Sequence, residues 1–292
     1  MTIGEALKYA YYILKRENID TYMLDAQLLL QKVLKKDKLF IILNRSETIS
    51  NNDKEEFIKL INLRKDKMPV KYILGECEFM GLSFTIKEGV LIPRADTEIL
   101  VEEVIKEIKS KGYTKICDVC CGSGAIGISI GKYIENSIVH CYDISDIAIE
   151  VTKENINKFS LEDRVNVRKS DLLTVAKEEN KKFDIIVSNP PYIKEEVIPT
   201  LMDDVKEYEP YIALCGGVDG LDFYKKITNQ SLQLLEDDGL LAFEIGYDQG
   251  EEVKELLIKN GFSSVRVIND LAGLNRVAIG KRNKDKTLKD KA

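Results

Sequence analysis

The sequence predicts an α/β protein in which a doubly wound parallel sheet follows a small all-α bundle and a β-hairpin. Residues 1–75 carry apolar side chains at helical spacing, with no glycine between Gly4 and Gly75. Later residues alternate apolar strands with helices, the pattern of a sheet covered on both faces. We therefore expect an N-terminal helical bundle at 1–75, a β-hairpin linker at 76–92, an α/β domain at 93–282 and a disordered tail at 283–292.

The N-terminal region predicts four helices. Helical spacing of apolar residues covers 3–14 and 23–34, and a short third helix is expected at Lys38–Leu43. Asn51 or Asn52 is expected to cap the fourth, and Pro69 to end the bundle. The pattern does not decide between a scaffold or dimerisation module and a recognition module.

The remaining elements follow from alternation and periodicity. Alternating apolar residues around Gly81 predict the hairpin. Strands are expected at 115–120, 138–143, 165–169, 183–189, 240–246, 264–269 and 275–280, and helices at 97–111, from 125, at 146–158, 221–235 and 251–260. The last two strands flank a turn around Gly273 and are expected to form an antiparallel pair.

Composition and charge exclude several classes of protein. With 44% hydrophobic and 32% charged residues, the chain is typical of a soluble protein of about two domains. No run of about 18 apolar residues and no secretory signal is visible, so the cytoplasm is the expected location. Residues 75–280 carry 23 basic and 37 acidic side chains, which argues against extended phosphate contacts to nucleic acid and suits a basic protein partner.

Six cysteines in a chain without a signal are expected to be reduced thiols. A zinc site is the alternative, with candidate ligands Cys117, Cys120, Cys121, His140 and Cys141. Structural zinc ligands usually lie on tight turns, whereas these residues lie in two apolar runs. We therefore expect small buried side chains and no metal.

A glycine-rich loop is predicted between the first strand of the α/β domain and the helix after it. It consists of Cys120, Cys121, Gly122, Ser123 and Gly124. Glycines allow a tight turn and a close approach of ligand to backbone, and the helix start offers free N–H groups. Many such turns need glycine for geometry alone, so the loop is weak evidence by itself.

Two acidic residues follow the next two strands. Asp143 is placed to accept the hydroxyls of a ribose, the alternative being an Asx turn or helix cap. Asp171 is placed to reach an adenine edge, or to cap the following helix. The loop and Asp143 together favour a nucleoside-containing cofactor.

The strand at 183–189 ends abruptly in Asn189, Pro190, Pro191 and Tyr192. Ligands of open α/β sheets bind at this end of the strands. Prolines lack a backbone N–H and fix φ, so the carbonyls near Asn189 and Pro190 are free to face a ligand as acceptors. With the Asn189 side chain and the Tyr192 ring, they suit a planar NH₂ group.

The loop, Asp143 and the Asn-Pro-Pro-Tyr tetrapeptide, in this order, resemble the class I S-adenosylmethionine-dependent methyltransferases that modify planar amino groups. The segment Leu91–Glu98, the helical N-terminus, the run Phe243–Gly250 and Asn275–Arg276 narrow the resemblance to the PrmC/HemK family. This family comprises glutamine methyltransferases of class 1 peptide release factors. The resemblance covers residues 1–282.

The resemblance implies a Rossmann-like, seven-stranded class I methyltransferase domain. It implies methyl transfer from S-adenosyl-L-methionine to the glutamine amide nitrogen of the release factor GGQ motif, leaving S-adenosyl-L-homocysteine. It places the cofactor against residues 120–124, Asp143, Asp171, Leu172 and Asn189, the substrate and catalysis at residues 189–192, and Arg94, Thr97 and Glu98 beside the cofactor. The helical bundle is implied to recognise the substrate, with no membrane or direct nucleic-acid contact.

Three positions depart from the family pattern. Cys120 and Cys121 replace a glycine and a small hydroxyl residue, so a Cβ is expected to crowd the methionine moiety and weaken cofactor affinity. Leu172 replaces an aromatic residue found in some members, so adenine stacking is expected to be weaker. The alternatives are a ribosomal-protein glutamine methyltransferase, a DNA or RNA amino-group methyltransferase, and a non-catalytic cofactor-binding protein.

We hypothesise a mechanism based on paired acceptors. An amide nitrogen is a poor nucleophile because its lone pair is delocalised into the carbonyl. Asn189 Oδ1 and the Pro190 carbonyl are expected to accept both N–H bonds of the substrate, orient its lone pair and stabilise the positive charge developing on nitrogen. Tyr192 is expected to pack against the amide plane, and His140 to lie in the core.

Overall fold

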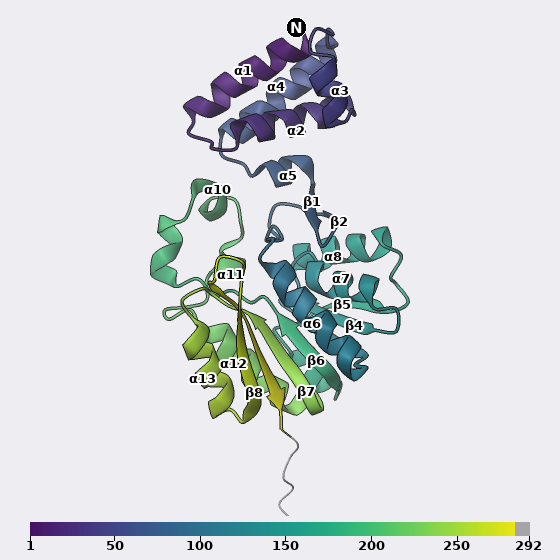
Figure 1. Cartoon of the computed structure of the whole chain (residues 1–292), viewed down its shortest axis with the longest axis vertical. Coiled ribbons are helices and arrows are strands. Elements are labelled where there is room, and N and C mark those ends of the chain that lie inside the picture. The colour runs from purple at the N-terminus through teal and green to yellow at the C-terminus, as the bar shows by residue number, and fades with distance from the viewer. Residues whose placement is uncertain (284–292) are drawn as a thin grey trace, which may run out of the picture. The chain divides into compact units, whose positions relative to one another are not determined.

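The structure is a computed structural model that describes residues 1–283 (Figure 1). It divides into two compact units, which we describe separately. The helical unit contains Met1–Cys77 and Met202–Tyr208, and the α/β unit contains Glu78–Leu201 and the chain from Glu209 onward. The domain limits expected at 75, 92 and 282 stay predictions. Apart from Asn283, the tail predicted to be disordered lies outside the described residues.

The helical unit contains the four predicted helices and a fifth. They are α1 (Ile3–Arg16), α2 (Tyr22–Leu34), α3 (Lys38–Leu43), α4 (Asn51–Lys65) and α5 (Val70–Leu74). The Ser50 side chain caps α4, so the prediction of Asn51 or Asn52 is wrong. The prediction that Pro69 ends the bundle is also wrong, because Pro69 precedes α5, whose Ile73 packs in the common core.

A buried ion pair fixes α2 against α4 in this unit. Arg64 Nε donates to Asp25 Oδ2 at 2.7 Å, and both side chains are almost fully buried. A short stretch from the second half of the chain, Met202–Tyr208, also belongs here and contains α10 (Asp203–Lys206). The Tyr208 hydroxyl donates to the Asp66 carbonyl, so this stretch is held at the end of α4.

The predicted hairpin pairs β1 (Glu76–Phe79) with β2 (Leu82–Thr85). Met80 and Gly81 form its turn with φ of 51° and 68°, the left-handed conformation that tight hairpins need. Residues 86–92 form no strand, so the hairpin is shorter than the predicted linker.

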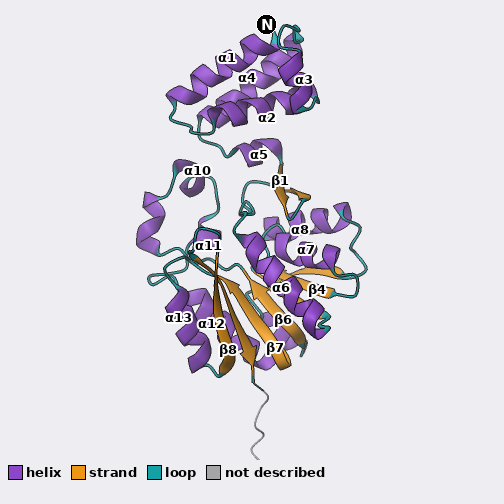
Figure 2. Cartoon of the chain, viewed as in Figure 1, coloured by secondary structure: helices purple, strands orange, loops and turns teal. Residues whose placement is uncertain are grey.

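A seven-stranded sheet forms the centre of the α/β unit, as Figure 2 shows in orange. The strands are β3 (Lys115–Val119), β4 (Ile138–Asp143), β5 (Val165–Lys169), β6 (Phe183–Ser188), β7 (Leu235–Glu244), β8 (Phe262–Asn269) and β9 (Asn275–Arg282). Their order is β5-β4-β3-β6-β7-β9-β8, and β9 runs antiparallel to both of its neighbours. The predicted doubly wound sheet and its closing antiparallel pair are confirmed.

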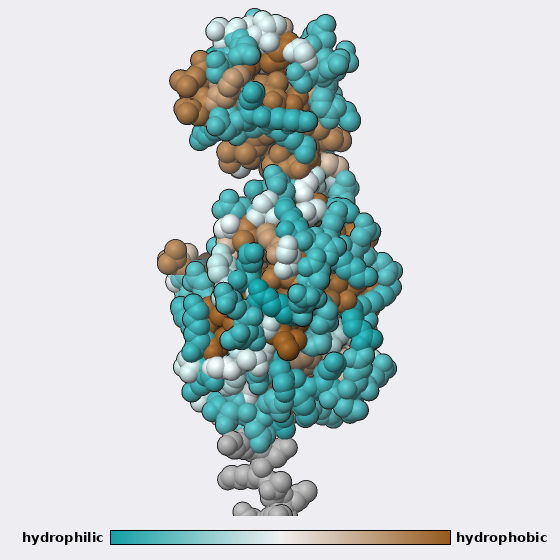
Figure 3. Space-filling model, turned by 90° about the vertical axis from the view of Figure 1, so that its right-hand side faces the viewer, coloured by the Kyte–Doolittle hydropathy of each residue, from teal (hydrophilic) through white to brown (hydrophobic). Residues whose placement is uncertain are grey.

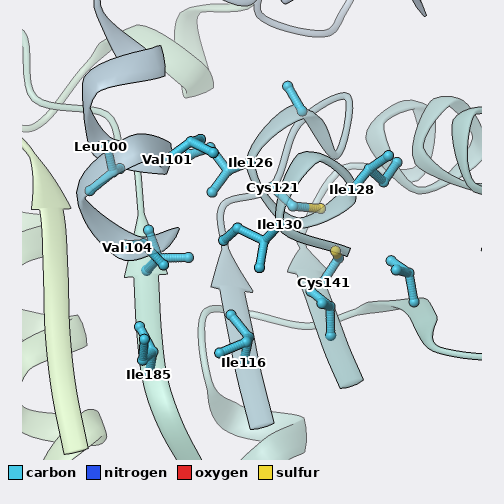
Figure 4. Close-up of a cluster of buried hydrophobic side chains, with 14 of the residues drawn as sticks. Leu100, Val101, Val104, Ile116, Cys121, Ile126, Ile128, Ile130, Cys141 and Ile185 are labelled. Atoms are coloured by element: carbon cyan, nitrogen blue, oxygen red, sulfur yellow. The ribbon is translucent and has the colours of Figure 1, made fainter. Parts of the chain in front are cut away.

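Helices cover both faces of this sheet. One face carries α6 (Thr97–Lys111), α7 (Ala125–Tyr133) and α8 (Asp146–Lys158). The other carries α9 (Thr174–Glu178), α12 (Asp222–Leu234) and α13 (Gly250–Lys259). Figure 4 shows the first core, where Val104 of α6 and Ile130 of α7 point toward Ile116 and Ile185 of the sheet.

Two segments of the α/β unit differ from the prediction. β7 begins at Leu235, five residues before the strand expected at 240–246, with a register shift and a left-handed Asp238, the features of a bulge. In the connection after β6, where no element is expected before residue 221, the α/β unit contains the 3₁₀ helix η1 (Glu195–Thr200) and α11 (Tyr211–Leu214), and α10 of the helical unit lies between them in the sequence.

The candidate zinc ligands lie on opposite faces of the sheet. Cys121 and Cys141 pack in the core under α7, whereas Cys117 and Cys120 pack in the core on the other face. His140 packs beside Tyr142 and Phe183. These side chains therefore do not surround one point.

No helix within residues 1–283 combines the length and the apolar character that crossing a bilayer requires.

Candidate active site

A cavity of about 260 Å³ lies in the α/β unit at the carboxyl ends of β3, β4 and β6. The sheet grows outward from β3 through β4 on one side and through β6 on the other, so the cavity lies where the strand order reverses. It is lined by Gly89–Leu91, Pro93, Arg94, Thr97, Cys120–Ser123, Ala125, Ile126, Tyr142–Ser145, Ala148, Ser170–Leu172, Asn189, Pro191, Pro210, Ile212, Ala213, Phe223 and Lys226.

The glycine-rich loop turns sharply between β3 and α7. Cys120, Gly122 and Gly124 have φ of 59°, 57° and 78°, all in the left-handed region. A Cβ on Gly124 would lie 2.8 Å from side-chain atoms of Ile128 and Thr152. This position therefore requires glycine both for its backbone and for space.

Side chains of α8 hold the loop from outside the cavity. Thr152 Oγ1 donates to the Gly122 carbonyl at 2.9 Å, and Asn155 Nδ2 donates to the Ser123 carbonyl at 3.0 Å. Asn155 also exchanges two hydrogen bonds with the backbone of Thr85 in β2. The loop conformation is thus fixed by contacts with neighbouring elements.

Asp143 closes one side of the loop. Its Oδ2 accepts the Gly122 N–H at 2.8 Å and its Oδ1 accepts the Ser145 N–H at 2.9 Å. Burial raises the pKa of this carboxyl, and these hydrogen bonds lower it. The hydrogen bond from the Ser145 N–H is the Asx turn that the sequence offers as the alternative to ribose binding. A carboxylate oxygen can accept two hydrogen bonds and each of these accepts one from the backbone, so both can still accept one from a ligand.

Asp171 and Leu172 lie at the end of β5. Both line the cavity, Asp171 exposed and Leu172 buried with φ of 48°. The alternative that the Asp171 side chain caps the next helix is wrong, because Leu173 is the N-cap residue of α9 and the Val175 N–H in its first turn donates to Ser170 Oγ.

Asn189 follows β6 and is half-buried at the cavity wall. Its Nδ2 donates to Thr97 Oγ1 at 3.2 Å, and Thr97 Oγ1 in turn donates to Glu244 Oε2 at 2.5 Å. The Pro190 carbonyl accepts no hydrogen bond from another group among residues 1–283. Asn189 Oδ1 and the Pro190 carbonyl are therefore without a partner in this part of the chain, although only Asn189 lines the cavity.

Tyr192 is anchored at both its hydroxyl and its backbone. The hydroxyl donates to Glu244 Oε1 at 3.2 Å, and burial raises the pKa of this phenol. The Tyr192 carbonyl accepts from Gln249 Nε2 at 3.0 Å, and Gln249 Oε1 accepts the Gly246 N–H and the Tyr224 hydroxyl. The buried amide of Gln249 thus makes hydrogen bonds with both its nitrogen and its oxygen, and it anchors the backbone at the last residue of the tetrapeptide.

The structure gathers most of the predicted site residues around one cavity. Cys120, Cys121, Gly122, Ser123, Asp143, Asp171, Leu172, Asn189, Pro191, Arg94 and Thr97 line it. Four others do not line it: Gly124 faces α7 and α8, Glu98 accepts the Met80 N–H of the hairpin, Pro190 is buried, and Tyr192 reaches Glu244. The roles predicted for all of these residues stay predictions.

Sequence reasoning assigned no role to Glu244 or Gln249. Glu244 is a charged residue inside the apolar run Leu240–Ile245, and this signal would have marked it as a buried polar contact. It is 1% exposed, and burial raises the pKa of its carboxyl while Thr97, Tyr192 and Arg276 lower it. Gln249 gives no comparable signal, because only the folded chain brings its partners together.

Comparisons with known proteins place the chain in a family. Two family models match, a PrmC N-terminal domain over residues 5–75 and a methyltransferase small domain over residues 94–204. A release factor glutamine methyltransferase of Clostridium botulinum is 60% identical over 277 residues, covering 95% of this chain and 98% of that protein. One of Clostridium acetobutylicum is 52% identical over 282 residues, covering 97% and 99%.

Solved structures share the fold of the α/β unit. The T. thermophilus 16S rRNA N2 G1207 methyltransferase in complex with AdoMet and guanosine has a TM-score of 0.51 and 16% identity, covering 71% of this chain and 50% of that one. At this identity the likeness concerns the fold alone. The predicted class I methyltransferase fold and the predicted family are both confirmed. The chain belongs to the release factor glutamine methyltransferase family.

Proposed function

We propose that this protein transfers a methyl group from S-adenosylmethionine to the side-chain amide nitrogen of the glutamine in the GGQ motif of class 1 release factors. The position of Asn189 at the cavity wall is the observation that supports this function most directly. Asn189 lines the same cavity as the glycine-rich loop and Asp143, so acceptors for a carboxamide and groups suited to a nucleoside share one site. The family relationship gives the substrate class.

The residues of the cavity fit the cofactor. Asp143 offers carboxylate oxygens for ribose hydroxyls, and Leu172 and Ile144 offer apolar contacts for an adenine ring. The sharp turn at Gly122 and Gly124 leaves the loop backbone open to close approach. When bound, S-adenosylmethionine supplies a methyl group on a positively charged sulfur.

Asn189 and Pro190 are proposed to hold the substrate carboxamide. Asn189 Oδ1 and the Pro190 carbonyl each accept one N–H, so the nitrogen lone pair faces the methyl donor and developing positive charge is stabilised. One N–H bond of the glutamine is replaced by N–CH₃, the released proton passes to water, and S-adenosylhomocysteine remains. Tyr192 is proposed to pack its ring against the amide plane, with its hydroxyl held by Glu244.

The helical unit is proposed to bind the release factor at a distance from its GGQ motif. Residues 1–74 carry 14 basic and 10 acidic side chains, the opposite balance to the rest of the described chain. Leu39, Ile42 and Leu43 of α3 are 62%, 47% and 72% exposed. Figure 3 shows brown, hydrophobic surface on this unit. Exposed apolar side chains beside basic ones suit a protein partner.

The proposal includes no metal and no direct contact with nucleic acid or membrane. It places the reaction in the cytoplasm, where translation termination uses release factors.

The decisive experiment is mass spectrometry of a class 1 release factor after incubation with the enzyme and S-adenosylmethionine. We expect one added methyl group on the GGQ glutamine. Ribosomal proteins and RNA are incubated in parallel, because methyl transfer to either of these, with none to the release factor, would replace the proposal with that alternative. No transfer to any of the three would support the non-catalytic alternative.

The role of the helical unit has its own test. The double variant Leu39→Glu/Leu43→Glu introduces charge at two exposed positions of α3 and changes no residue of the α/β unit. We expect the KM for intact release factor to rise several-fold, on the order of 1 kcal/mol, and the KM for a short GGQ peptide to stay unchanged. Equal changes in both KM values would count against this role.

A further inference from the structure

We propose that Thr97 and Glu244 are positioning residues that hold the Asn189 carboxamide in one of its two orientations, with Oδ1 toward the cavity. The inference rests on the proposed function, because it concerns how the acceptor is prepared for the substrate. An asparagine side chain can rotate by half a turn and exchange its oxygen and its NH₂ group at little intrinsic cost. Only the oxygen can accept an N–H bond from the substrate.

The three side chains come from separate elements and meet beside the cavity. Asn189 follows β6, Thr97 begins α6 and Glu244 ends β7. Thr97 is 4% exposed and Glu244 is 1% exposed. The chain of hydrogen bonds runs from Asn189 Nδ2 to Thr97 Oγ1 at 3.2 Å, and from Thr97 Oγ1 to Glu244 Oε2 at 2.5 Å.

The direction of these hydrogen bonds follows from the chemistry of the groups. An ionised carboxylate only accepts, so the single hydroxyl hydrogen of Thr97 is used on Glu244. The Thr97 oxygen then has only lone pairs to offer, and the group of Asn189 that faces it must be the NH₂. Glu244 thus acts on Asn189 through Thr97.

The hydrogen bond to the second oxygen of Glu244 supports the same direction of donation, toward the carboxylate. Glu244 Oε1 accepts the Tyr192 hydroxyl at 3.2 Å, so both oxygens face donors. Burial raises the pKa of this carboxyl, and the hydrogen bonds from Thr97 and Tyr192 together with the charge of Arg276 oppose that rise. Two donated hydrogen bonds and a neighbouring guanidinium favour the ionised, accepting form.

Loss of the Thr97 hydroxyl should release the orientation of Asn189. In Thr97→Val, an NH₂ group facing the valine would be left without an acceptor, so the carboxamide turns that group toward the cavity. The substrate N–H would then meet a donor. Removing one hydrogen-bond donor from an oxyanion hole lowers turnover by about 10²–10³-fold. By analogy, partial loss of the Asn189 acceptor through rotation should lower kcat by about 10–100-fold.

The test compares Thr97→Val with Thr97→Ser and Thr228→Val in full-length protein. Serine keeps the hydroxyl, so it should restore most of the turnover. Thr228 of α12 is also buried and lies outside the cavity, and its hydroxyl has no hydrogen-bond partner among residues 1–283, so its variant controls for the loss of a buried hydroxyl. We expect the Kd for S-adenosylmethionine, measured by calorimetry, to change by less than about 3-fold in all three, because valine and serine nearly keep the volume of threonine and the Thr97 hydroxyl is used on Glu244 and Asn189.

A second readout does not depend on activity. Hydrogen exchange of the Asn189 NH₂ group is followed by NMR in protein labelled with ¹⁵N-asparagine, with Asn189→Ala assigning the signal. We expect exchange at least about 10-fold faster in Thr97→Val than in the wild type, and slow exchange in Thr97→Ser. Unchanged exchange in Thr97→Val, or equal loss of turnover in Thr97→Ser, would overturn the inference. A wild-type enzyme with no activity on release factors would instead overturn the proposed function, and exchange would still decide the inference.

Discussion

The two halves of the cavity are held in different ways. In the cofactor half, the loop at residues 120–124 contacts Asp143, Thr152 and Asn155, and every partner lies within 32 residues along the chain. In the acceptor half, Asn189 contacts Thr97 across 92 residues, and Thr97 contacts Glu244 across 147. The cofactor half is thus built from adjacent strand–loop–helix units, whereas the acceptor half depends on the completed sheet. Substitutions in the two halves should therefore affect different constants.

The largest effect is expected in the acceptor half. Asn189→Ala removes one proposed acceptor of the substrate carboxamide, so kcat should fall by about 10²–10³-fold while the Kd for S-adenosylmethionine stays near the wild-type value. Single-turnover kinetics and calorimetry measure the two constants. Asn157→Ala on the exposed side of α8 is the matched control. Unchanged turnover in Asn189→Ala would contradict the proposed role of this residue.

The same contrast explains what the sequence could predict. The seven strands, the glycine-rich loop and the place of Asp143 follow from periodicity and local turn chemistry, which adjacent residues determine. The connection between Glu244 and Asn189 needs the order β6-β7 and the position of α6, which no local pattern contains. α5 was missed for a similar reason, because a five-residue helix after Pro69 is stabilised by its packing and is too short for periodicity to reveal.

A substitution in the cofactor half should change binding first. Asp143→Asn places an NH₂ group against the N–H of Gly122 or Ser145, where two donors repel. It also removes the charge proposed to accept the ribose hydroxyls, so the Kd for S-adenosylmethionine should rise by about 10–100-fold. At saturating cofactor, kcat should fall much less than in Asn189→Ala. If kcat collapses while Kd is unchanged, the assignment of the two halves is wrong.

Gly124→Ala tests how strictly the cofactor loop is built. The φ of 78° would strain the backbone of an alanine, and the added Cβ would lie 2.8 Å from neighbouring side-chain atoms. Together, strain and overpacking should lower the free energy of unfolding by about 2–4 kcal/mol. Gly112→Ala separates the two causes, because Gly112 has φ of 72° and nothing within 4 Å of the added Cβ. It should lose only about 1–2 kcal/mol in urea unfolding. Equal losses would mean that the loop accommodates the methyl group.

A pH-dependent stability should come from Asp118, which lies at the base of the same loop. Burial raises the pKa of its carboxyl from 3.8 to about 7, although Oδ2 accepts the Gly127 N–H at 2.8 Å. The folded protein therefore binds this proton more tightly than the unfolded chain. The stabilisation is complete below pH 3.8 and is lost as the pH rises toward 7, by about 1.4 kcal/mol per pH unit.

Asp118→Asn removes this titration and keeps an acceptor for Gly127. Urea unfolding at about pH 5 and pH 6.5 should therefore show a shallower fall in stability for the variant than for the wild type. Asp163→Asn, an exposed change, serves as the control and should keep the wild-type slope. A variant slope equal to that of the wild type would assign the pH dependence to other groups.

The smallest effect is expected at Cys120, where this chain departs from the glycine of its family. Cys120 has φ of 59° and lines the cavity, so its Cβ costs backbone energy and occupies space in the cavity proposed to hold the cofactor. Cys120→Gly relieves that strain but adds conformational entropy to the unfolded chain, and the two effects, each about 1 kcal/mol, should nearly cancel in stability. The Kd for S-adenosylmethionine should instead fall by about 2–5-fold, a gain of up to about 1 kcal/mol.

Cys120→Ala keeps the Cβ and should bind like the wild type, which separates crowding by the Cβ from any effect of the thiol. Weaker binding in both variants would mean that the sulfur makes a favourable contact with the cofactor, and that the cysteine compensates for the strained backbone on which it lies.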